Sequence, residues 1–387
     1  MPTTPAKNLL YRAALPILAP RSRGQMTHHV FGHPLTTLPN YERILAKHHV
    51  FGASLLLQDG ANCALCDTST ANPEHLAQEN TLYRVASITK MATALVTLRC
   101  IDNGLFALDS EAASLLPDGE KAPALSGVTV RHLLCHTSGL RDLPILDDCL
   151  KEGKPYTELL RQPEIRACAP GQQLIYSNFG FGLLGCILEQ QTGLCIEPLF
   201  QEMLFRPLHM RATLDASMLN EAEIMPITRV LPYRAGQELR VTTLGRHPLQ
   251  KPNPLCHYGH TAGAMYTDGR SVLQMLTLIY QRGTMDETRL IGESLMQEMT
   301  RRQSATPTRT YGLGLVILNR PEISPRQLLG HQGFAYGCVD GAFIEEEMGR
   351  AVVFLNGGAS EARTGRLGLV NRDVLQWALK QEMPSWT

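Results

Sequence analysis

The sequence of 387 residues has no long apolar run and no net charge, and each absence excludes a class of protein. Nowhere do roughly 18 apolar residues follow one another, so we expect no membrane span. The absence of repeats argues against solenoid architectures. Lys and Arg together number 36, as do Asp and Glu, so no overall field favours nucleic acid or an acidic membrane surface. A small neutral or zwitterionic substrate fits this balance better than a polyanion.

The ten cysteines lack the arrangement of a disulfide framework or a zinc site. Cys63 and Cys66 form one close pair, but no second pair of ligands follows at similar spacing, so we interpret them as neighbours on one strand or turn. Scattered thiols in a chain of this length are typical of a reducing compartment. The N-terminal residues also lack a convincing signal peptide, because Arg12 and Pro16 interrupt their apolar patch. We predict a cytoplasmic protein, with a periplasmic or secreted location left open.

What the sequence does contain is typical of a folded α/β protein, with 44% hydrophobic and 19% charged residues. Strand-like runs occupy both ends of the chain, at residues 50–57, 62–68, 311–318, 327–330, 336–345 and 350–356. Helical patterns fill the middle and close the chain, at residues 87–103, 129–136, 177–191, 268–281, 291–301 and 367–383.

This order of elements predicts one α/β domain assembled from both ends of the chain, with an antiparallel sheet flanked by helices, and a mostly helical inserted domain. We expect an N-terminal arm over residues 1–38, with little periodicity. The α/β domain then comprises residues 39–86 together with 305–387, and the helical domain comprises residues 87–304. The active site is expected where the two domains meet.

The first motif whose residues could perform catalysis is Ser87-x-x-Lys90, where an extended segment gives way to a helical pattern. Residues three apart lie on one helix face, so Lys90 can reach back over Ser87. A neutral amine in that position can accept the hydroxyl proton and create a nucleophile. Taken alone, the motif is weak evidence, because it is more typical of an N-capping Ser followed by a solvated Lys.

A second motif, Tyr176-Ser177-Asn178, leads from a turn into a helix. A Tyr beside an amine can act as a general acid or base. Asn178 can form hydrogen bonds to a substrate amide or position Lys90. The competing interpretation is a helix cap with Ser177 as the N-cap residue.

The third motif is His331-Gln332-Gly333-Phe334, between two strand-like runs. Small residues there let a substrate lie along a strand edge, and His331 can hold a carboxylate or polarise the site. The competing interpretation is a surface His in a β-turn.

In this order, the three motifs resemble the active-site set of the serine β-lactamase and penicillin-binding protein family, in its class C β-lactamase branch. That branch includes D-alanyl-D-alanine carboxypeptidases, D-aminopeptidases and esterases. The segment His136-Thr137-Ser138-Gly139-Leu140 matches one common in the family, and residues 261–267 resemble its Gly-rich segment before a helix. The resemblance covers about residues 40–380.

The resemblance implies a role for each matching residue. Ser87 is the nucleophile that forms an acyl-enzyme, while Lys90 and Tyr176 share proton transfer, with the base in each step left open. Asn178 contacts the acyl amide of the substrate. The backbone N–H groups of Ser87 and Phe334 form the oxyanion hole. No metal and no organic cofactor are implied.

One departure from the family pattern concerns substrate choice. Class C β-lactamases have Lys followed by Thr or Ser where this chain has His331-Gln332, ahead of Gly333. A His in that position is typical of the carboxypeptidase-, aminopeptidase- and esterase-like members. We therefore predict a serine hydrolase acting on an ester or a peptide- or amide-like small molecule. An acyltransferase, a weak β-lactamase and a non-catalytic binding or assembly relative are left open, as is the oligomeric state.

Overall fold

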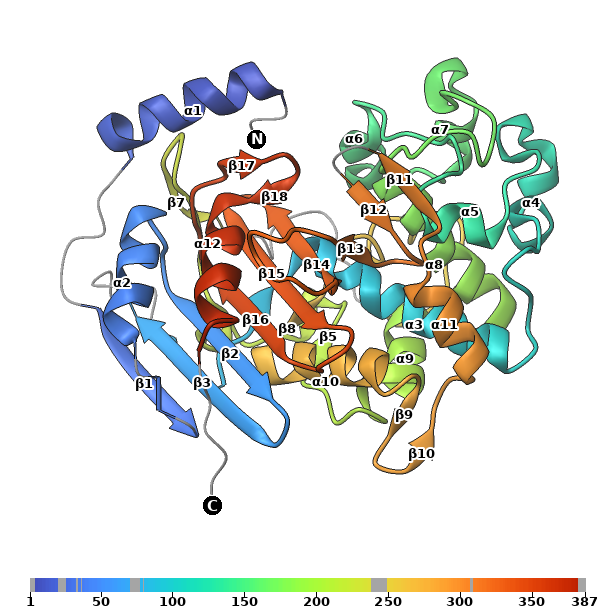
Figure 1. Cartoon of the computed structure of the whole chain (residues 1–387). Helices are drawn as coiled ribbons and strands as arrows, with labels where there is room; N and C mark the ends of the chain where they lie inside the picture. Colours follow the sequence, from blue (N-terminus) through green and yellow to red (C-terminus); the bar gives the residue numbers. More distant parts are fainter. Residues whose placement is uncertain are drawn as a thin grey trace.

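The computed structural model describes residues 4–19, 26–32, 34–35, 37–69, 77–78, 80–237, 249–306 and 309–381. Strands from both ends of the chain form a large sheet with helices on both faces, and a mostly helical part lies beside it (Figure 1). This is the predicted α/β arrangement of an antiparallel sheet flanked by helices with a mostly helical inserted part, which the resemblance noted above implies as a β-lactamase/transpeptidase-like fold. Within the described residues no single helix has the length and apolarity to cross a membrane, although Asn178–Thr192 and Ile196–Phe205, which are bent by 86°, meet both criteria as a pair.

The main sheet has nine strands in the order β1-β3-β2-β16-β15-β14-β13-β12-β11, and every neighbouring pair is antiparallel. Its strands are β1 (Thr27–Gly32), β2 (Ala53–Asp59), β3 (Asn62–Ser69), β11 (Ser304–Thr306), β12 (Arg309–Tyr311), β13 (Val316–Leu318), β14 (Leu328–Ala335), β15 (Cys338–Glu345) and β16 (Ala351–Asn356). Cys63 and Cys66 both lie on β3 as free thiols, as predicted.

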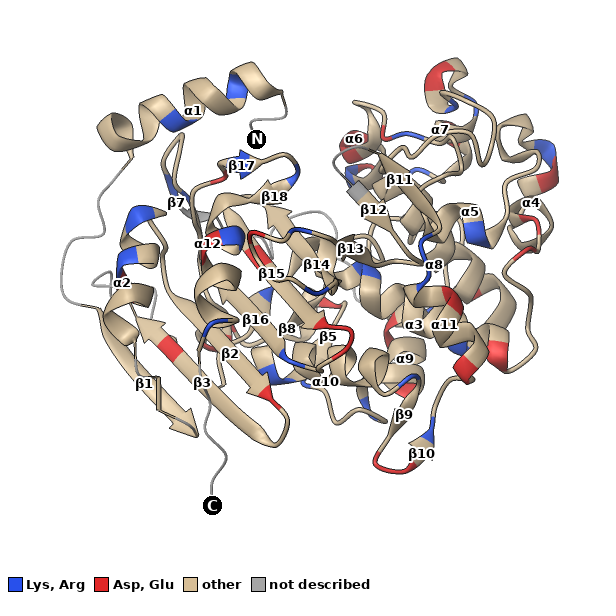
Figure 2. Cartoon of the chain, viewed as in Figure 1, with Lys and Arg blue, Asp and Glu red and all other residues tan. Residues whose placement is uncertain are grey.

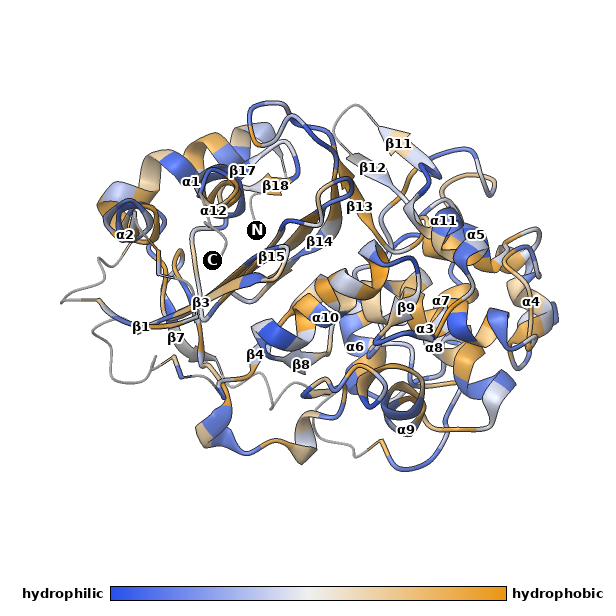
Figure 3. Ribbon diagram, turned by 60° about the horizontal axis from the view of Figure 1, so that its bottom comes forward, coloured by the Kyte–Doolittle hydropathy of each residue, from blue (hydrophilic) through white to orange (hydrophobic). Residues whose placement is uncertain are grey.

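The sheet separates two hydrophobic cores. Successive side chains along each strand point to opposite faces of the sheet, so each strand contributes residues to both cores. On β16, Val353 and Leu355 pack into the core shared with the helical part, whereas Val352 and Phe354 pack into the core on the opposite face. Helices α2 (Leu38–Lys47) and α12 (Leu369–Ala378) cover this second face, and α10 (Gly269–Tyr280) covers the first (Figure 3). Burial on both faces explains why these strands are continuous apolar runs.

The helical part is built around α3 (Thr89–Asp102) and α8 (Asn178–Thr192), which pack against each other. Around them lie α4 (Ala112–Leu115), α5 (Val130–Leu134), α6 (Leu146–Lys151), α7 (Thr157–Leu160), α9 (Ile196–Phe200) and α11 (Glu293–Thr300). The other described strands form four small sheets of two or three strands each: β4 (Tyr83–Arg84), β5 (Ala212–Thr213), β6 (Ile227–Arg229), β7 (Arg234–Gln237), β8 (Tyr266–Thr267), β9 (Thr284–Met285), β10 (Thr288–Arg289), β17 (Arg363–Thr364) and β18 (Leu367–Gly368).

The structure differs from the sequence prediction at the N-terminus, where little periodicity was expected. Residues Pro5–Leu18 form helix α1, and β1 pairs with β3 as an edge strand of the main sheet. The α1 pattern is hard to recognise because Pro16 and Arg12 interrupt its apolar residues. β1 is hard to recognise because five of its six residues are exposed, so hydrophobic burial leaves no alternation.

Two predicted strand boundaries near the C-terminus were also wrong. The run 311–318 is two short strands, β12 and β13, joined by a turn in which Gly314 has a φ of +67°. The His331-Gln332-Gly333 motif lies inside β14 rather than between strands. Its glycines suggested a break, but pairing with β15 continues through Ala335 and holds the segment extended.

Candidate active site

Ser87 lies in a short 3₁₀ turn, η1 (Ala86–Ile88), between β4 and α3. Of residues 81–90, Ser87 is the one that is not buried. The preceding Ala86 has a φ of 46°, a left-handed conformation that is unfavourable for alanine. The Thr89 hydroxyl stabilises it by donating to the Ala86 carbonyl at 2.6 Å. The turn therefore presents one hydroxyl to solvent from an otherwise closed surface.

Lys90 is fully buried, and its Nζ lies 3.2 Å from Ser87 Oγ. The same nitrogen donates to Asn178 Oδ1 at 2.9 Å and to the Ala262 carbonyl at 2.6 Å. Burial lowers the pKa of Lys90 to about 7, and the nearby Asp142 carboxylate opposes that shift. A neutral amine has two N–H bonds and one lone pair. With both N–H bonds given to carbonyl acceptors, the lone pair is left to face Ser87.

Tyr176 approaches Ser87 from the extended segment before α8, and its hydroxyl donates to Ser87 Oγ at 2.8 Å. The Tyr176 ring stacks on His136 at 4.3 Å between centroids, and Lys90 Nζ lies 4.9 Å from the Tyr176 ring centroid. His136 Nδ1 also accepts the backbone N–H of Ser177 at 3.2 Å. His136 therefore packs against Tyr176 and fixes the direction from which Tyr176 approaches Ser87.

Asn178 begins α8, with Ser177 as its N-cap residue, as the sequence predicted. Its Nδ2 donates to Asp142 Oδ2 at 2.7 Å, while Asp142 Oδ1 accepts from the Phe179 N–H at 2.9 Å. A carboxylate at a helix N-terminus is favoured by the helix dipole. Asp142 therefore sets the amide of Asn178 so that its oxygen faces Lys90. The sequence analysis missed Asp142, and the available signal was an acid two residues after the matched segment 136–140.

The sheet supplies the opposite wall through His331, Gln332, Gly333 and Phe334 of β14. A Cβ on Gly333 would lie 2.4 Å from the Val85 carbonyl, so glycine lets β14 approach the Ser87 turn. His331 is buried, and its Nδ1 lies 2.7 Å from the Gln332 carbonyl, which fixes the proton on that nitrogen. Ser87 and Phe334 line the same cavity. The roles of Gly333 and Phe334 in an oxyanion hole stay predictions.

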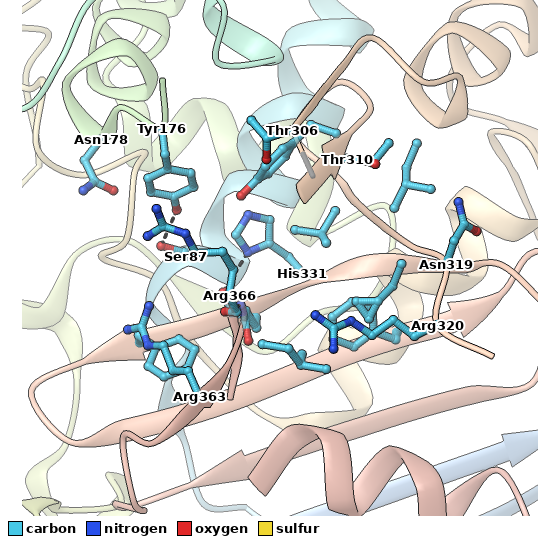
Figure 4. Close-up of a pocket in the computed structure, with 18 residues that line it drawn as sticks. Ser87, Tyr176, Asn178, Thr306, Thr310, Asn319, Arg320, His331, Arg363 and Arg366 are labelled. Carbon is cyan, nitrogen blue, oxygen red and sulfur yellow. Dashed lines mark hydrogen bonds between the residues drawn. The ribbon is translucent and has the colours of Figure 1, made fainter. Parts of the chain in front are cut away.

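The cavity has a volume of about 460 Å³ and is lined by Ser87, Tyr176, Asn178 and His331 together with residues from the C-terminal third of the chain (Figure 4). Three arginines line it: Arg320, Arg363 and Arg366. Figure 4 shows Arg366 reaching toward Ser87 and Tyr176. Among the described residues that line the cavity there is no Asp or Glu. The sequence analysis missed the arginines, because no motif marks them.

The Gln332 side chain connects the motif strand to the arginine segment. Its Nε2 donates to the Arg366 carbonyl at 2.6 Å, and its Oε1 accepts the Gly368 N–H at 3.1 Å. Arg363 lies over the Phe334 ring, 3.9 Å from the guanidinium carbon to the ring centroid. The β17–β18 turn is thereby fastened to β14 beside the cavity.

A cluster with metal-ligand chemistry lies outside the cavity, where Glu189, Cys195 and His257 place ligand atoms within 4.8 Å of one another. The Glu189 carboxylate already accepts the backbone N–H groups of Ile196 and Asn253, at 2.9 and 2.8 Å. It also lies 2.7 Å from His257 Nδ1. These contacts fasten the end of α8 to its neighbours and account for the buried carboxylate.

Comparison with known proteins bears on the family and the fold of this chain. The sequence model of the family described as Beta-lactamase matches residues 40–373. The chain is similar to Esterase EstB of Burkholderia gladioli, with 28% identity over 80% of this chain and 85% of the esterase. It is 32% identical to monacolin J acid methylbutanoyltransferase of Aspergillus terreus, but over 34% of this chain and 37% of the transferase. The fold is similar to that of D-amino acid amidase from Ochrobactrum anthropi SV3 (TM-score 0.68, 22% identity, 89% of this chain and 98% of the amidase).

Proposed function

This chain belongs to the Beta-lactamase family and is a serine hydrolase, and we propose that it cleaves small carboxylic esters through an acyl-enzyme on Ser87. The observation that carries the proposal is the pair of contacts on Ser87 Oγ. Lys90 Nζ lies at 3.2 Å and the Tyr176 hydroxyl at 2.8 Å. One group can thus remove the proton of the Ser87 hydroxyl while the other donates a proton to the leaving group.

In the acylation step, neutral Lys90 accepts the Ser87 proton as Oγ attacks the ester carbonyl. With a pKa of about 7, close to half of the Lys90 amines are neutral near pH 7. The tetrahedral oxyanion forms beside the backbone N–H groups of Ser87 and Phe334. Its collapse breaks the ester C–O bond, and the proton passes from Lys90 through Tyr176 to the leaving alkoxide, which departs as an alcohol. Water then repeats the sequence on the acyl-enzyme and releases the acid.

The charges of the cavity favour an ester that also has a carboxylate. Three arginines and no described acid line it, and although Arg320 is paired with Glu322 at 3.4 Å, the excess of positive charge attracts an anion and repels an ammonium. An amino acid amide brings an ammonium and is disfavoured on this ground. The whole-chain charge balance suggested a neutral or zwitterionic substrate, but local charge at the site outweighs it because Coulomb attraction falls with distance.

Acyl transfer is a second candidate, supported by the partial similarity to the methylbutanoyltransferase. The chemistry of acylation is the same, and an alcohol replaces water in the second step. Adding candidate alcohols to the ester assay tests it. A new ester product would support transfer, and hydrolysis alone would exclude those acceptors.

The test of the leading proposal is intact-protein mass spectrometry after mixing with a p-nitrophenyl ester, with a β-lactam as a second probe. We expect a mass increase equal to one acyl group, absent from Ser87→Ala, together with a fall in ester turnover of roughly 10⁴-fold or more. Ser126→Ala, which changes an exposed serine outside the lining of the cavity, is the matched control. If folded wild-type protein forms no adduct and shows no turnover with either probe, the proposal is wrong.

A further inference from the structure

Helix α1 presents an apolar face to solvent. Leu9, Leu10, Ile17 and Leu18 expose 68%, 71%, 80% and 63% of their surface. Among the described residues, these are four of the thirteen large hydrophobic side chains that are exposed. Figure 3 shows the apolar colour along this surface helix. Isolated exposed apolar residues are ordinary, but a group of them on one helix marks an interaction surface.

The opposite face of α1 is already occupied by the body of the protein. Leu15 is buried in a small core that includes Phe51 and Val230. The Asn8 side chain donates to the Arg363 carbonyl at 2.8 Å and accepts the Arg363 N–H at 2.9 Å. The inner face therefore fixes the orientation of the helix, and the protein's own packing leaves the outer apolar residues uncovered.

The charges of the N-terminal segment are all of one sign. The first 41 residues contain Lys7, Arg12, Arg21 and Arg23 and no acid, which leaves 32 basic and 36 acidic residues in the remainder. Lys7 and Arg12 are exposed, and 3.6-residue periodicity places Lys7 beside Leu18 at one border of the apolar face and Arg12 beyond Leu9 at the other. Figure 2 shows α1 with basic residues and without acidic ones. Although the whole chain has no net charge, helix α1 therefore has a surface that is both apolar and positively charged.

We propose that α1 binds the surface of an anionic lipid bilayer, lying parallel to it with its outer face among the acyl chains and Lys7 and Arg12 at the headgroups. An apolar face flanked by cations is the arrangement of interfacial helices. Anionic headgroups attract each such cation. A second copy of this chain is a poorer occupant, because a two-fold interface would bring the same cations face to face.

Membrane binding through α1 would place the catalytic cavity near the lipid surface. The Asn8 contacts attach α1 to Arg363, which lines the cavity. Figure 1 shows α1 and the β17–β18 turn at the same end of the molecule. The proposal rests on α1 alone and stands or falls independently of the reaction at Ser87.

The test is flotation of the full chain with vesicles of phosphatidylcholine alone and of a three-to-one mixture of phosphatidylcholine and phosphatidylglycerol. We expect binding to the mixed vesicles to be at least about tenfold tighter and to weaken in high salt. The double variant Leu10→Glu, Ile17→Glu should lose binding by at least about tenfold. Met218→Glu, which changes a residue 68% exposed elsewhere, should bind like wild type.

Thermal melts and turnover of a water-soluble ester serve as fold controls, because neither Leu10 nor Ile17 lines the cavity. Equal binding to both vesicle types, or undiminished binding by the double variant, would overturn the proposal. So would absence of vesicle binding by folded wild type. If sedimentation then shows a dimer that the double variant converts to a monomer, a second copy covers this face instead.

Discussion

The two walls of the cavity are built differently. On the helical wall, Lys90, Tyr176 and Asn178 are joined to Ser87 or to one another by hydrogen bonds of 2.8 to 3.2 Å. On the sheet wall, the groups are a strand edge that includes Gly333 and three arginine side chains, one from the segment after β13 and two from the β17–β18 hairpin. In the proposed reaction the helical wall therefore transfers protons, and the sheet wall selects the substrate by its shape and charge. Substitutions on the two walls should consequently change different kinetic quantities.

Removing the amine of the helical wall should have the largest effect. In Lys90→Met no group at that position can accept the Ser87 proton, so we expect kcat/KM to fall roughly 10²- to 10⁴-fold for every ester. Steady-state kinetics on neutral and anionic esters measure the change, with the exposed Lys121→Met as control. Loss confined to anionic esters would show that Lys90 recognises substrate instead.

Adding a side chain where the two walls meet should have the second-largest effect on activity. In Gly333→Ala the new Cβ would meet the Val85 carbonyl at 2.4 Å, forcing β14 away from the Ser87 turn and the Phe334 N–H away from the oxyanion. We expect kcat to fall about 10²-fold. Gly269→Ala, whose Cβ would make ordinary contacts beginning at 3.6 Å, is the control. An unchanged kcat would show that β14 does not contribute to the oxyanion hole.

The pH dependence tests the electrostatics of the helical wall. Protonated Lys90 cannot act as a base, so kcat/KM of the wild type should rise with pH through an apparent pKa of about 7. The Asp142 carboxylate raises the pKa of Lys90, so Asp142→Asn should move the rise to lower pH. The lost contacts to Asn178 and Phe179 should also lower the plateau about tenfold. A shift toward higher pH would contradict the assignment of Lys90 as the base.

Neutralising one arginine of the sheet wall should have the smallest effect and the most selective one. Arg366 is exposed, so its attraction for a substrate carboxylate is worth about 1 kcal/mol, or about fivefold in kcat/KM. Arg366→Met should lose that factor for an ester with a carboxylate and leave its neutral analogue unchanged. Arg161→Met, an exposed arginine paired with Glu158, serves as the control. An equal loss of kcat/KM for both esters would show that Arg366 acts in the reaction itself and not in recognising the substrate carboxylate.

The same contrast explains which site residues the sequence could predict. Ser87 and Lys90 are three apart on the helical wall, and Tyr176 and Asn178 flank a helix cap, so short-range geometry relates each pair. The Ala262 carbonyl carries no side-chain signature, yet it takes one N–H of the Lys90 amine. Asp142 lies in a loop whose position depends on packing. Their roles could not be predicted, because backbone acceptors and loop positions leave no pattern in a sequence.

The sequence by itself predicted the α/β class, because the spacing of apolar residues along helices and strands fixes which side chains share a local face. The order of its motifs resembled that of the family and so predicted the candidate residues for acyl transfer. Only the tertiary structure decided that Asp142 orients Asn178, that three arginines line the cavity beside Ser87, and that α1 turns apolar residues outward. Each of these depends on segments distant in the chain, such as Asn8 and Arg363, meeting in space. Such encounters are set by the burial of the whole core, and no local pattern encodes them.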